Sequence, residues 1–297
     1  MNTDFHQSRF PLIFSKIKFF LNAIKFEESV FALPFAYMGM MLAGHGFPKV
    51  DVFVMISVAM VSARTVGMIA NRVIDQKIDA KNPRTSGRHL PTGQLKTIEL
   101  MVPGTVSLII FIITAWQLNT LALVLSPFAL AYLIMYPYAK RFTWSANIIL
   151  GWALAMAPSA AWIAVTGTLA WPPVLLSLSV ALWAGSFDII YHTQDIEFQR
   201  RENLHSIPTK FGLVASFRIA QTMDVLAVIC LVGLGAWLEL NVLYFISCII
   251  SACLLWYKFR LVKVENLKGI SMSFMRINPM VSITMLVGTI LTIYLTP

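Results

Sequence analysis

The stretch VFVMISVAMVSARTVGMIANRVIDQKIDAKNPRTSGR, residues 52–88, passes without a break from an apolar run into a segment rich in charged side chains. Its first part, residues 52–72, is long and apolar enough to cross a lipid bilayer as a helix, which needs roughly 20 such residues. Its second part places two aspartates among several basic side chains. We therefore expect a membrane-spanning helix that ends in a charged functional segment.

The composition of the whole chain also indicates a membrane protein. Of its 297 residues, 58% are hydrophobic and only 12% are charged, and the mean hydropathy is +0.73. A soluble domain cannot bury that much apolar surface. Apolar windows predict about nine spanning helices, at 28–45, 52–72, 98–117, 119–138, 145–167, 173–193, 217–238, 241–258 and 277–296. The expected fold class is an all-α polytopic membrane protein.

The organisation of the chain is expected to be simple. The predicted spans leave no room for a soluble appendage, so residues 1–297 should form a single integral domain. Residues 1–25 are basic and amphipathic and lack a cleavage site, which favours a segment on the membrane surface over a signal peptide. The net charge of +9 would suggest nucleic acid in a soluble protein, but here the positive-inside rule explains it and no nucleic-acid partner is expected.

The basic residues also predict the orientation in the membrane. If the N-terminus lies in the cytoplasm, the loops rich in Lys and Arg all lie on that side. These loops are residues 77–96, 140–141, 200–210 and 258–276. We therefore expect a multi-pass protein of the cell inner membrane with these loops in the cytoplasm and with membrane lipids around it.

Two acidic clusters follow parallel predicted helices. Asn71, Asp75 and Asp79 are four residues apart and project from one side of a helix. Arg64 shares that side and, as a charge within a span, is a candidate functional residue or a structural salt bridge. The second cluster, Asp188, His192, Asp195 and Gln199, follows helical steps of the same kind. Because both helices run in the same direction, as in a parallel repeat, the two clusters can converge on one ligand.

The residue types of the clusters indicate their chemistry. Sparse carboxylates suit Mg²⁺, which is typically held by one or two carboxylates together with substrate phosphates. His192 is more easily explained by hydrogen bonds to its neighbouring carboxylates than by metal ligation. Basic side chains beside the acids suit an anion such as a diphosphate, although many of them also follow from the positive-inside rule. These bases are Arg72, Lys77, Lys81, Arg84, Arg88, Lys140, Arg141, Arg200, Arg201 and Lys210.

These residues resemble the UbiA superfamily of intramembrane prenyltransferases. Its N-D-x-x-D-x-x-x-D pattern matches Asn71, Asp75 and Asp79, and further similar segments are FEESVFALPFA, YPYAKR, QDIEF and LHSIP. The version N-R-x-x-D-x-x-x-D-A-x-N-P-R-T resembles the branch of 4-hydroxybenzoate polyprenyltransferase and its menaquinone-pathway relatives. There are two departures: Arg72 and Gln199 stand where many members have Asp. The second could weaken a Mg²⁺ site.

The resemblance implies helices around a central cavity and a Mg²⁺-dependent transfer of a polyprenyl group from polyprenyl diphosphate to an aromatic acceptor. The acceptor would be a benzoate-like or naphthoate-like acid of ubiquinone or menaquinone biosynthesis. The prenyl group would react as an allylic cation, which the electron-rich ring of the acceptor attacks. The implied catalytic residues and metal ligands are Asp75, Asp79, Asp188 and Asp195. The implied substrate-binding residues are Asn71, Arg64, Arg72, Arg84, Arg88, Tyr136, Lys140, His192 and Gln199. Candidate aromatic faces for the cation are Phe31, Phe35, Tyr132 and Tyr136.

Three alternatives remain open from the sequence. A transporter of anionic solutes could also use nine spans and intramembrane charges such as Arg64 and Asp188. A related enzyme could prenylate haem, a chlorophyll precursor or a lipid glycerol, because the diphosphate motifs would be shared. A catalytically weakened member of the family would be consistent with Gln199.

Overall fold

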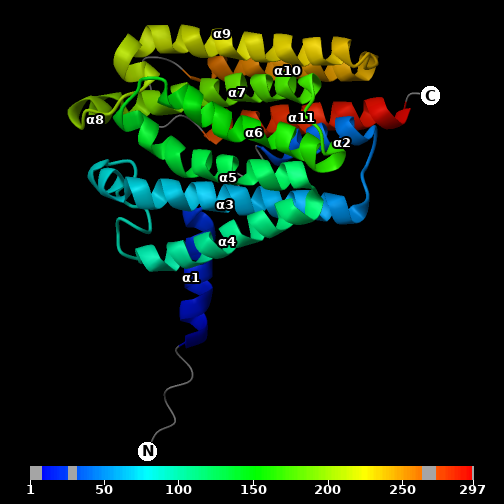
Figure 1. Ribbon diagram of the computed structural model, residues 1–297. Coiled ribbons are helices and arrows are strands. Elements are labelled where there is room, and N and C mark those ends of the chain that lie inside the picture. Colours follow the sequence, from blue (N-terminus) through cyan, green and yellow to red (C-terminus); the bar gives the residue numbers. More distant parts are fainter. Residues whose placement is uncertain (1–8, 26–31, 263–271, 296–297) are drawn as a thin grey trace, which may run out of the picture.

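The computed structural model describes residues 9–25, 32–262 and 272–295, and these ranges form a helical bundle (Figure 1). Its long helices are α3 (Val50–Lys81), α4 (Thr97–Leu118), α5 (Thr120–Met135), α6 (Ala146–Thr166), α7 (Trp171–His192), α9 (Ile207–Trp237), α10 (Val242–Arg260) and α11 (Met272–Leu295). Its shorter elements are α1 (Arg9–Ala23), α2 (Leu33–Gly44), η2 (Tyr136–Arg141), η3 (Thr193–Asp195) and α8 (Ile196–Arg201). The predicted all-α class is confirmed.

The long helices run side by side, and α7 lies in the interior of the bundle. It packs against α6 on one side and α9 on the other. Helices α9 and α10 form one edge of the bundle, and α3 and α4 form the opposite edge (Figure 1). Helix α1 crosses the long helices at a steep angle (Figure 1). This placement gives α7, which carries part of the second acidic cluster, the least contact with lipid.

Eight helices of the described residues are long and apolar enough to cross a membrane. The counterpart of the first predicted span is α2, which has 12 residues; the beginning of that span, residues 28–31, lies outside the described residues, as do residues 263–271 of the last basic loop. Every other predicted span coincides with one of the eight helices. The chain is therefore an integral multi-pass membrane protein.

Two predicted boundaries were wrong for physical reasons. Helix α3 continues to Lys81 rather than ending at residue 72, because its last turns are charged and hydropathy cannot detect them. Helix α9 begins at Ile207 rather than at 217. Its first turn is separated from the apolar part by Gly212, whose φ of 79° breaks the helical path at a position that favours glycine. Both corrections lengthen the helices at the end where the charged clusters lie.

Helices α6 and α7 approach each other closely at a small residue. A Cβ atom at Gly151 would lie 2.3 Å from the carbonyl oxygen of Ala181 and 3.0 Å from the backbone nitrogen of Gly185. Small residues allow this kind of close helix packing in membranes, where van der Waals contact drives association. The position of α7, and therefore of its acidic residues, depends on this contact.

We expect Gly151→Ala to lower the free energy of unfolding by roughly 1–3 kcal/mol, because the added methyl group collides with backbone that cannot move aside. Gly233→Ala is the matched control, since its Cβ would lie 3.6 Å from Leu175, an ordinary contact distance. Thermal unfolding in detergent measures both variants. Equal stability of the two would show that α6 and α7 separate easily at Gly151.

An ion pair is buried among four helices, away from the acidic clusters. Lys258 of α10 is 0% exposed and Asp224 of α9 is 4% exposed, and Lys258 Nζ lies 2.6 Å from Asp224 Oδ2. The same ammonium lies 3.4 Å from Ser186 Oγ on α7 and 5.9 Å from the ring centroid of Phe274 on α11. The pair therefore holds the C-terminal helices against α7.

Candidate active site

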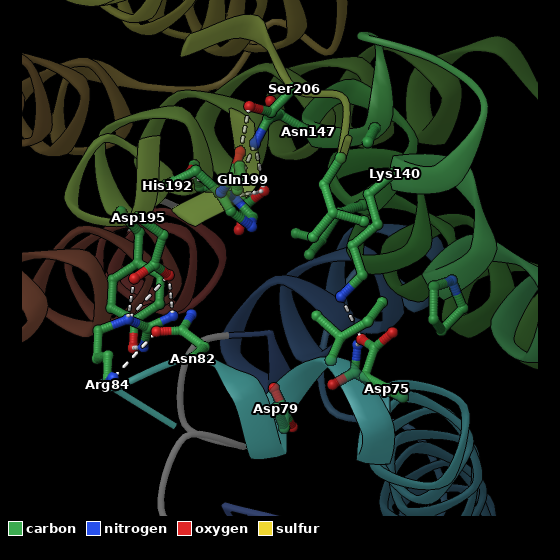
Figure 2. A pocket seen from close by; sticks show the side chains of 18 of the residues that line it. Asp75, Asp79, Asn82, Arg84, Lys140, Asn147, His192, Asp195, Gln199 and Ser206 are labelled. Atoms are coloured by element: carbon green, nitrogen blue, oxygen red, sulfur yellow. Dashed lines mark hydrogen bonds and ion pairs between the residues drawn. The ribbon is translucent and has the colours of Figure 1, made fainter. Parts of the chain in front are cut away.

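A polar pocket opens at the end of the bundle where α3 and α7 terminate (Figure 2). Its volume is about 210 Å³. The residues singled out from the sequence that line it are Asn71, Arg72, Asp75, Asp79, Arg84, Arg88, Tyr136, Lys140, Asp188, His192, Asp195 and Gln199. The structure thus brings the two acidic clusters and the YPYAKR segment into one cavity. The carboxylates of Asp75 and Asp195 lie on opposite sides of its opening (Figure 2).

Asp75 lies at the centre of the contacts between α3 and η2. It is 2% exposed, and its carboxylate accepts hydrogen bonds from three donors. Lys140 Nζ donates to Oδ2, Arg141 Nη2 donates to Oδ1 at 3.1 Å, and Asn71 Nδ2 donates to Oδ2 at 3.2 Å. A buried carboxylate needs this compensation, because leaving water costs several kcal/mol. The 3₁₀ turns of η2 place both bases within reach of Asp75.

Two further carboxylates are paired with arginines of the connection after α3. Arg88 Nη1 lies 2.6 Å from Asp79 Oδ2, and Arg84 Nε donates to both oxygens of Asp195 at 2.9 Å. Arg84 Nη1 also donates to Tyr191 Oη at 2.6 Å. Burial acts to lower the pKa of Arg84, but the hydrogen bond and charge of Asp195 raise it above its ordinary value. Arg84 is therefore a charged link between the first and second clusters.

Asp188 and His192 are held by Asn147, which was not predicted from the sequence. Asn147 is fully buried; its Nδ2 donates to Asp188 Oδ2 at 2.8 Å and lies 2.9 Å from His192 Nδ1. Its Oδ1 accepts from the N–H of Ile207 at 3.0 Å. One amide thus joins α6, α7 and α9. A signal was available, because an asparagine near the start of an apolar span needs hydrogen-bond partners.

Tyr191 was also missed, although its spacing could have revealed it. It lies three residues after Asp188 and four before Asp195, so a helix places all three on one face. Its hydroxyl group contacts Arg84 as described, and the Arg84 guanidinium lies 4.7 Å from its ring centroid. Lys25 Nζ lies 6.0 Å from the same ring. Tyr191 therefore forms part of the wall between both clusters.

Gln199, which replaces a motif aspartate, has a structural hydrogen bond. Ser206 Oγ donates to Gln199 Oε1 at 2.6 Å, and Ser206 is the N-cap residue of α9. The backbone carbonyl of Gln199 accepts from the N–H of Leu204 at 2.8 Å. Gln199 therefore stabilises the turn between α8 and α9 while lining the pocket.

We expect Gln199→Asp to leave turnover unchanged or lower, because the shorter side chain cannot reach Ser206 Oγ. The lost hydrogen bond should also reduce stability by about 1 kcal/mol. Gln199→Glu is the control, since it keeps the length and adds the same charge. The measurements are kcat and thermal unfolding in detergent. A large rise in kcat of the aspartate variant would instead support the weakened-member alternative.

An apolar chamber of about 240 Å³ adjoins the polar pocket. Arg64 lines this chamber rather than the polar pocket, and its Nη2 lies 3.4 Å from the carbonyl oxygen of Lys25. Arg72 is buried beside the pocket, where its Nε donates to the carbonyl oxygen of Ala23 at 2.7 Å. The two arginines thus contact Ala23 at the end of α1 and Lys25 just after it.

The aromatic residues predicted to face the allylic cation lie in different environments. Tyr136 lines both the pocket and the chamber. Phe35 does not line either cavity; it packs in the core against Trp183 with ring centroids 5.2 Å apart. Tyr132 donates its hydroxyl to the carbonyl oxygen of Ile149 at 2.8 Å, and Phe31 lies outside the described residues. Hydropathy and composition could not separate cavity residues from packing residues here.

The donor atoms of the pocket fit Mg²⁺ only if a substrate supplies further ligands. Among the described residues, no three His, Cys, Asp or Glu side chains are close enough together to ligate one ion. Four carboxylates nevertheless line one cavity, and Mg²⁺ usually takes one or two carboxylates together with waters and phosphate oxygens. Asp75, Asp79, Asp188 and Asp195 are therefore suited to a Mg²⁺ ion that a phosphate-bearing substrate shares.

A comparison with protein families identifies the chain. The family model described as the UbiA prenyltransferase family matches residues 32–280, most of the sequence. The chain belongs to the UbiA prenyltransferase family. It is accordingly an enzyme and a prenyltransferase, as the resemblance of its motifs predicted, and not the transporter considered as an alternative.

Curated relatives in the UbiA family agree with the branch predicted from the first motif. The 4-hydroxybenzoate octaprenyltransferase of Haemophilus ducreyi is 31% identical over 221 residues, which cover 74% of this chain and 79% of that protein. The enzyme of the same name from Vibrio cholerae is 28% identical over 255 residues, which cover 86% and 89%. The similarity therefore extends over most of each chain.

Solved structures of UbiA homologues share the fold. A UbiA homologue from Aeropyrum pernix is 29% identical with a TM-score of 0.81, covering 89% of this chain and 98% of that one. A homologue from Archaeoglobus fulgidus, solved with DMAPP and Mg²⁺, has a TM-score of 0.68, covers 93% and 99%, and is 16% identical. At that identity the second likeness shows the fold alone.

Proposed function

We propose that this UbiA-family enzyme transfers a polyprenyl group from a polyprenyl diphosphate to an aromatic acid of quinone biosynthesis, with Mg²⁺ as cofactor. The observation that carries the proposal is that the polar pocket and the apolar chamber lie side by side and share part of their walls. Residues that line both are Lys25, Met68, Tyr136, Leu150, Asp188 and Tyr191. A polyprenyl diphosphate has one charged and one apolar part, joined at the carbon that reacts, and matches this pair of cavities.

The polar pocket supports binding and release of the diphosphate. Lys140, Arg84 and Arg88 line it, and each is bonded to a carboxylate. When bound, Mg²⁺ would neutralise diphosphate oxygens and assist departure of the leaving group. The carboxylates would then turn toward the metal, and the three bases would be able to donate to the diphosphate as its charge grows. The three bases would thus pair with carboxylates in the absence of substrate and with the diphosphate in its presence. The charges in the pocket would be compensated in both states.

The chamber supports formation of the allylic cation. Its lining is mostly apolar and includes Phe111, Phe187 and the two tyrosines at the junction with the pocket. Exclusion of water protects a carbocation from hydrolysis, and aromatic faces stabilise it. The prenyl tail would occupy the apolar part, and the reacting carbon would lie near Tyr136 and Tyr191.

Arg64 supports an acceptor that carries a carboxylate. It lines the chamber, where Lys25 is the other basic residue. An arginine within a membrane span is by default a candidate functional residue, and a guanidinium can hold a carboxylate by two parallel hydrogen bonds. An aromatic acid held by Arg64 would present its electron-rich ring toward the junction of the two cavities, where the cation forms.

Arg64→Met is expected to raise KM for the aromatic acid by roughly 10- to 100-fold, because a hydrogen bond to a charged group contributes about 1.5–3 kcal/mol. KM for the prenyl diphosphate should change little. The matched control is Arg218→Met on α9, whose arginine is exposed and lines neither cavity. A rise in KM for the diphosphate alone would place Arg64 at the donor rather than the acceptor.

The proposed reaction is tested with the purified full-length protein. It is incubated with a polyprenyl diphosphate and a panel of acceptors, with and without Mg²⁺, and lipid extracts are analysed by mass spectrometry. The panel holds 4-hydroxybenzoate, a hydroxynaphthoate, haem, a chlorophyll precursor and a phosphorylated glycerol. A prenylated aromatic acid that requires Mg²⁺ is expected. A product with a non-aromatic acceptor would overturn the acceptor class, and a product formed equally without Mg²⁺ would overturn the metal requirement.

We also propose that the pocket faces the cytoplasm from the inner membrane. The support is the positive-inside rule, since the basic connections after α3 and after α8 both lie at the pocket end of the bundle. A single cysteine placed at exposed Gln94, in a variant without its native cysteines, should resist a membrane-impermeant maleimide in intact cells and react in inverted vesicles. The opposite pattern would reverse the orientation.

A further inference from the structure

A second cleft lies beside the polar pocket, at the connections that precede α6 and α9. Phe142 and Trp144 form one side of it. Arg200, His205 and Lys210 contribute basic groups to its lining. His205 also lines the polar pocket, whereas Phe142, Trp144, Arg200 and Lys210 do not. The cleft is therefore a separate feature of the same end of the bundle.

The basic groups of this cleft are not used in ion pairs. In the described part of the chain, the salt bridges involve neither Arg200 nor Lys210, and the cleft lining contains no Asp or Glu. The bases of the polar pocket differ, because Arg84, Arg88 and Lys140 each hold a carboxylate. The cleft thus carries positive charge that no carboxylate of its lining offsets, and this charge is complementary to an anion.

Exposed aromatic side chains surround these bases. Phe142 is 78% exposed, and Lys210 Nζ lies 4.6 Å from the ring centroid of Trp144 and 5.4 Å from that of Phe211. Further along α9, Val214 is 59% exposed and continues the apolar surface away from the cleft. Amphipathic aromatic residues beside basic groups are typical of the level of lipid headgroups. The ligand that matches this surface has an anionic head and an apolar tail.

We propose that this cleft binds an anionic phospholipid, with the headgroup phosphate at Arg200 and Lys210 and the acyl chains along the exposed face of α9. Arg200 can donate two parallel hydrogen bonds to phosphate oxygens, and Lys210 adds a positive charge held in place by its aromatic neighbours. A zwitterionic lipid carries a cation beside its phosphate and gains less from this pair of bases. The cleft therefore distinguishes phosphatidylglycerol from phosphatidylcholine.

The bound lipid would also stabilise a wall of the active site. Leu204 and His205 line both the cleft and the polar pocket. The N–H of His205 donates to the carbonyl oxygen of Lys140 at 2.7 Å, and the Lys140 side chain contacts Asp75. A lipid that fixes this segment from outside would keep Lys140 placed in the pocket. This effect on turnover rests on the proposed function, whereas binding of the lipid does not.

Native mass spectrometry of the full-length protein tests the binding. The protein is mixed with phosphatidylglycerol and phosphatidylcholine of equal chain length in equal amounts. We expect preferential retention of one phosphatidylglycerol by the wild type and roughly a tenfold fall in the double variant R200Q/K210Q. The matched control K49Q/R260Q also removes one lysine and one arginine, both exposed and both outside the cleft and the exposed face of α9, and should retain the lipid.

Three results would overturn the proposal. Equal retention of both lipids by the wild type would contradict the preference for an anionic headgroup, and this result does not depend on any variant. Undiminished phosphatidylglycerol binding by R200Q/K210Q, with thermal unfolding unchanged, would place the lipid elsewhere. Displacement of the lipid by equimolar inorganic diphosphate would make the cleft a site for the soluble ion.

The rate of prenyl transfer provides a separate test of the link between the lipid and the pocket wall. In nanodiscs of phosphatidylcholine, adding phosphatidylglycerol should raise prenyl transfer by the wild type and by K49Q/R260Q but not by R200Q/K210Q. Binding without this stimulation would overturn the link to the pocket wall and leave the lipid site standing. Absence of prenyl transfer in every membrane would count against the proposed function, while the binding result would still decide the lipid site.

Discussion

Asp75→Asn is expected to lower kcat for prenyl transfer by roughly 10²- to 10³-fold, which is the effect of removing one electrostatic contact from a preorganised site. The aspartate provides the negative charge that pairs with Lys140 and Arg141, and it is a proposed Mg²⁺ ligand. An asparagine keeps the size and one oxygen acceptor but loses the charge. The variant should therefore fold, because about a quarter of each of these two basic side chains is exposed to solvent.

The matched control is Asp51→Asn, which makes the same change in the same helix. Asp51 lies exposed in the first turn of α3, at the end away from the pocket. The kcat of the Asp51→Asn variant should equal that of the wild type within experimental error. Mass spectrometry of the prenylated product gives kcat, and circular dichroism confirms helicity. Near-normal turnover by folded Asp75→Asn would contradict the role of this carboxylate.

Lys258→Met is expected to reduce the free energy of unfolding by about 3–5 kcal/mol, the usual cost of leaving one partner of a buried pair without its counter-charge. Methionine fills a similar volume, so the loss would come from Asp224 rather than from a cavity. Because the pair joins α7, α9, α10 and α11, the effect should appear as one cooperative shift. Thermal or denaturant unfolding in detergent measures it.

A double variant separates charge from packing at this pair. Asp224→Asn combined with Lys258→Met should recover most of the lost stability, since no isolated charge remains. Arg260→Met, two residues further along α10 and exposed, is the matched control and should have an effect within about 0.5 kcal/mol. If the double variant is as unstable as Lys258→Met alone, the ammonium packing rather than the counter-charge holds the helices together.

The parts of the structure that depend on local sequence could be predicted. Helical spans follow from apolar length, and the shared face of Asn71, Asp75 and Asp79 follows from the helical period. The convergence of two clusters also followed, because parallel helices end on the same side of a membrane. Hydropathy does not register charged helical turns, and the end of α3 was therefore placed too early.

The pairing of charges could not be predicted, because it depends on distant parts of the chain. Arg84 and Asp195 are brought together by the packing of α3 against the rest of the bundle, and no periodicity encodes their contact. The pairing of Asp224 with Lys258 could not be predicted either, because the two residues lie on different helices. For Asn147 the sequence indicated only that a polar residue near the start of an apolar span needs hydrogen-bond partners, and not that these partners are Asp188, His192 and the N–H of Ile207.

The pairing of the pocket carboxylates with bases has a consequence for selectivity. A cavity whose arginines and lysine were unpaired would attract any phosphorylated metabolite from the surrounding water over a long range. Here Asp75, Asp79 and Asp195 offset much of that field, so a nucleotide gains little from the bases and has no tail to place in the chamber. With the proposed cytoplasmic orientation and lipid substrate, the enzyme would thus remain available to that substrate in the presence of cellular nucleotides.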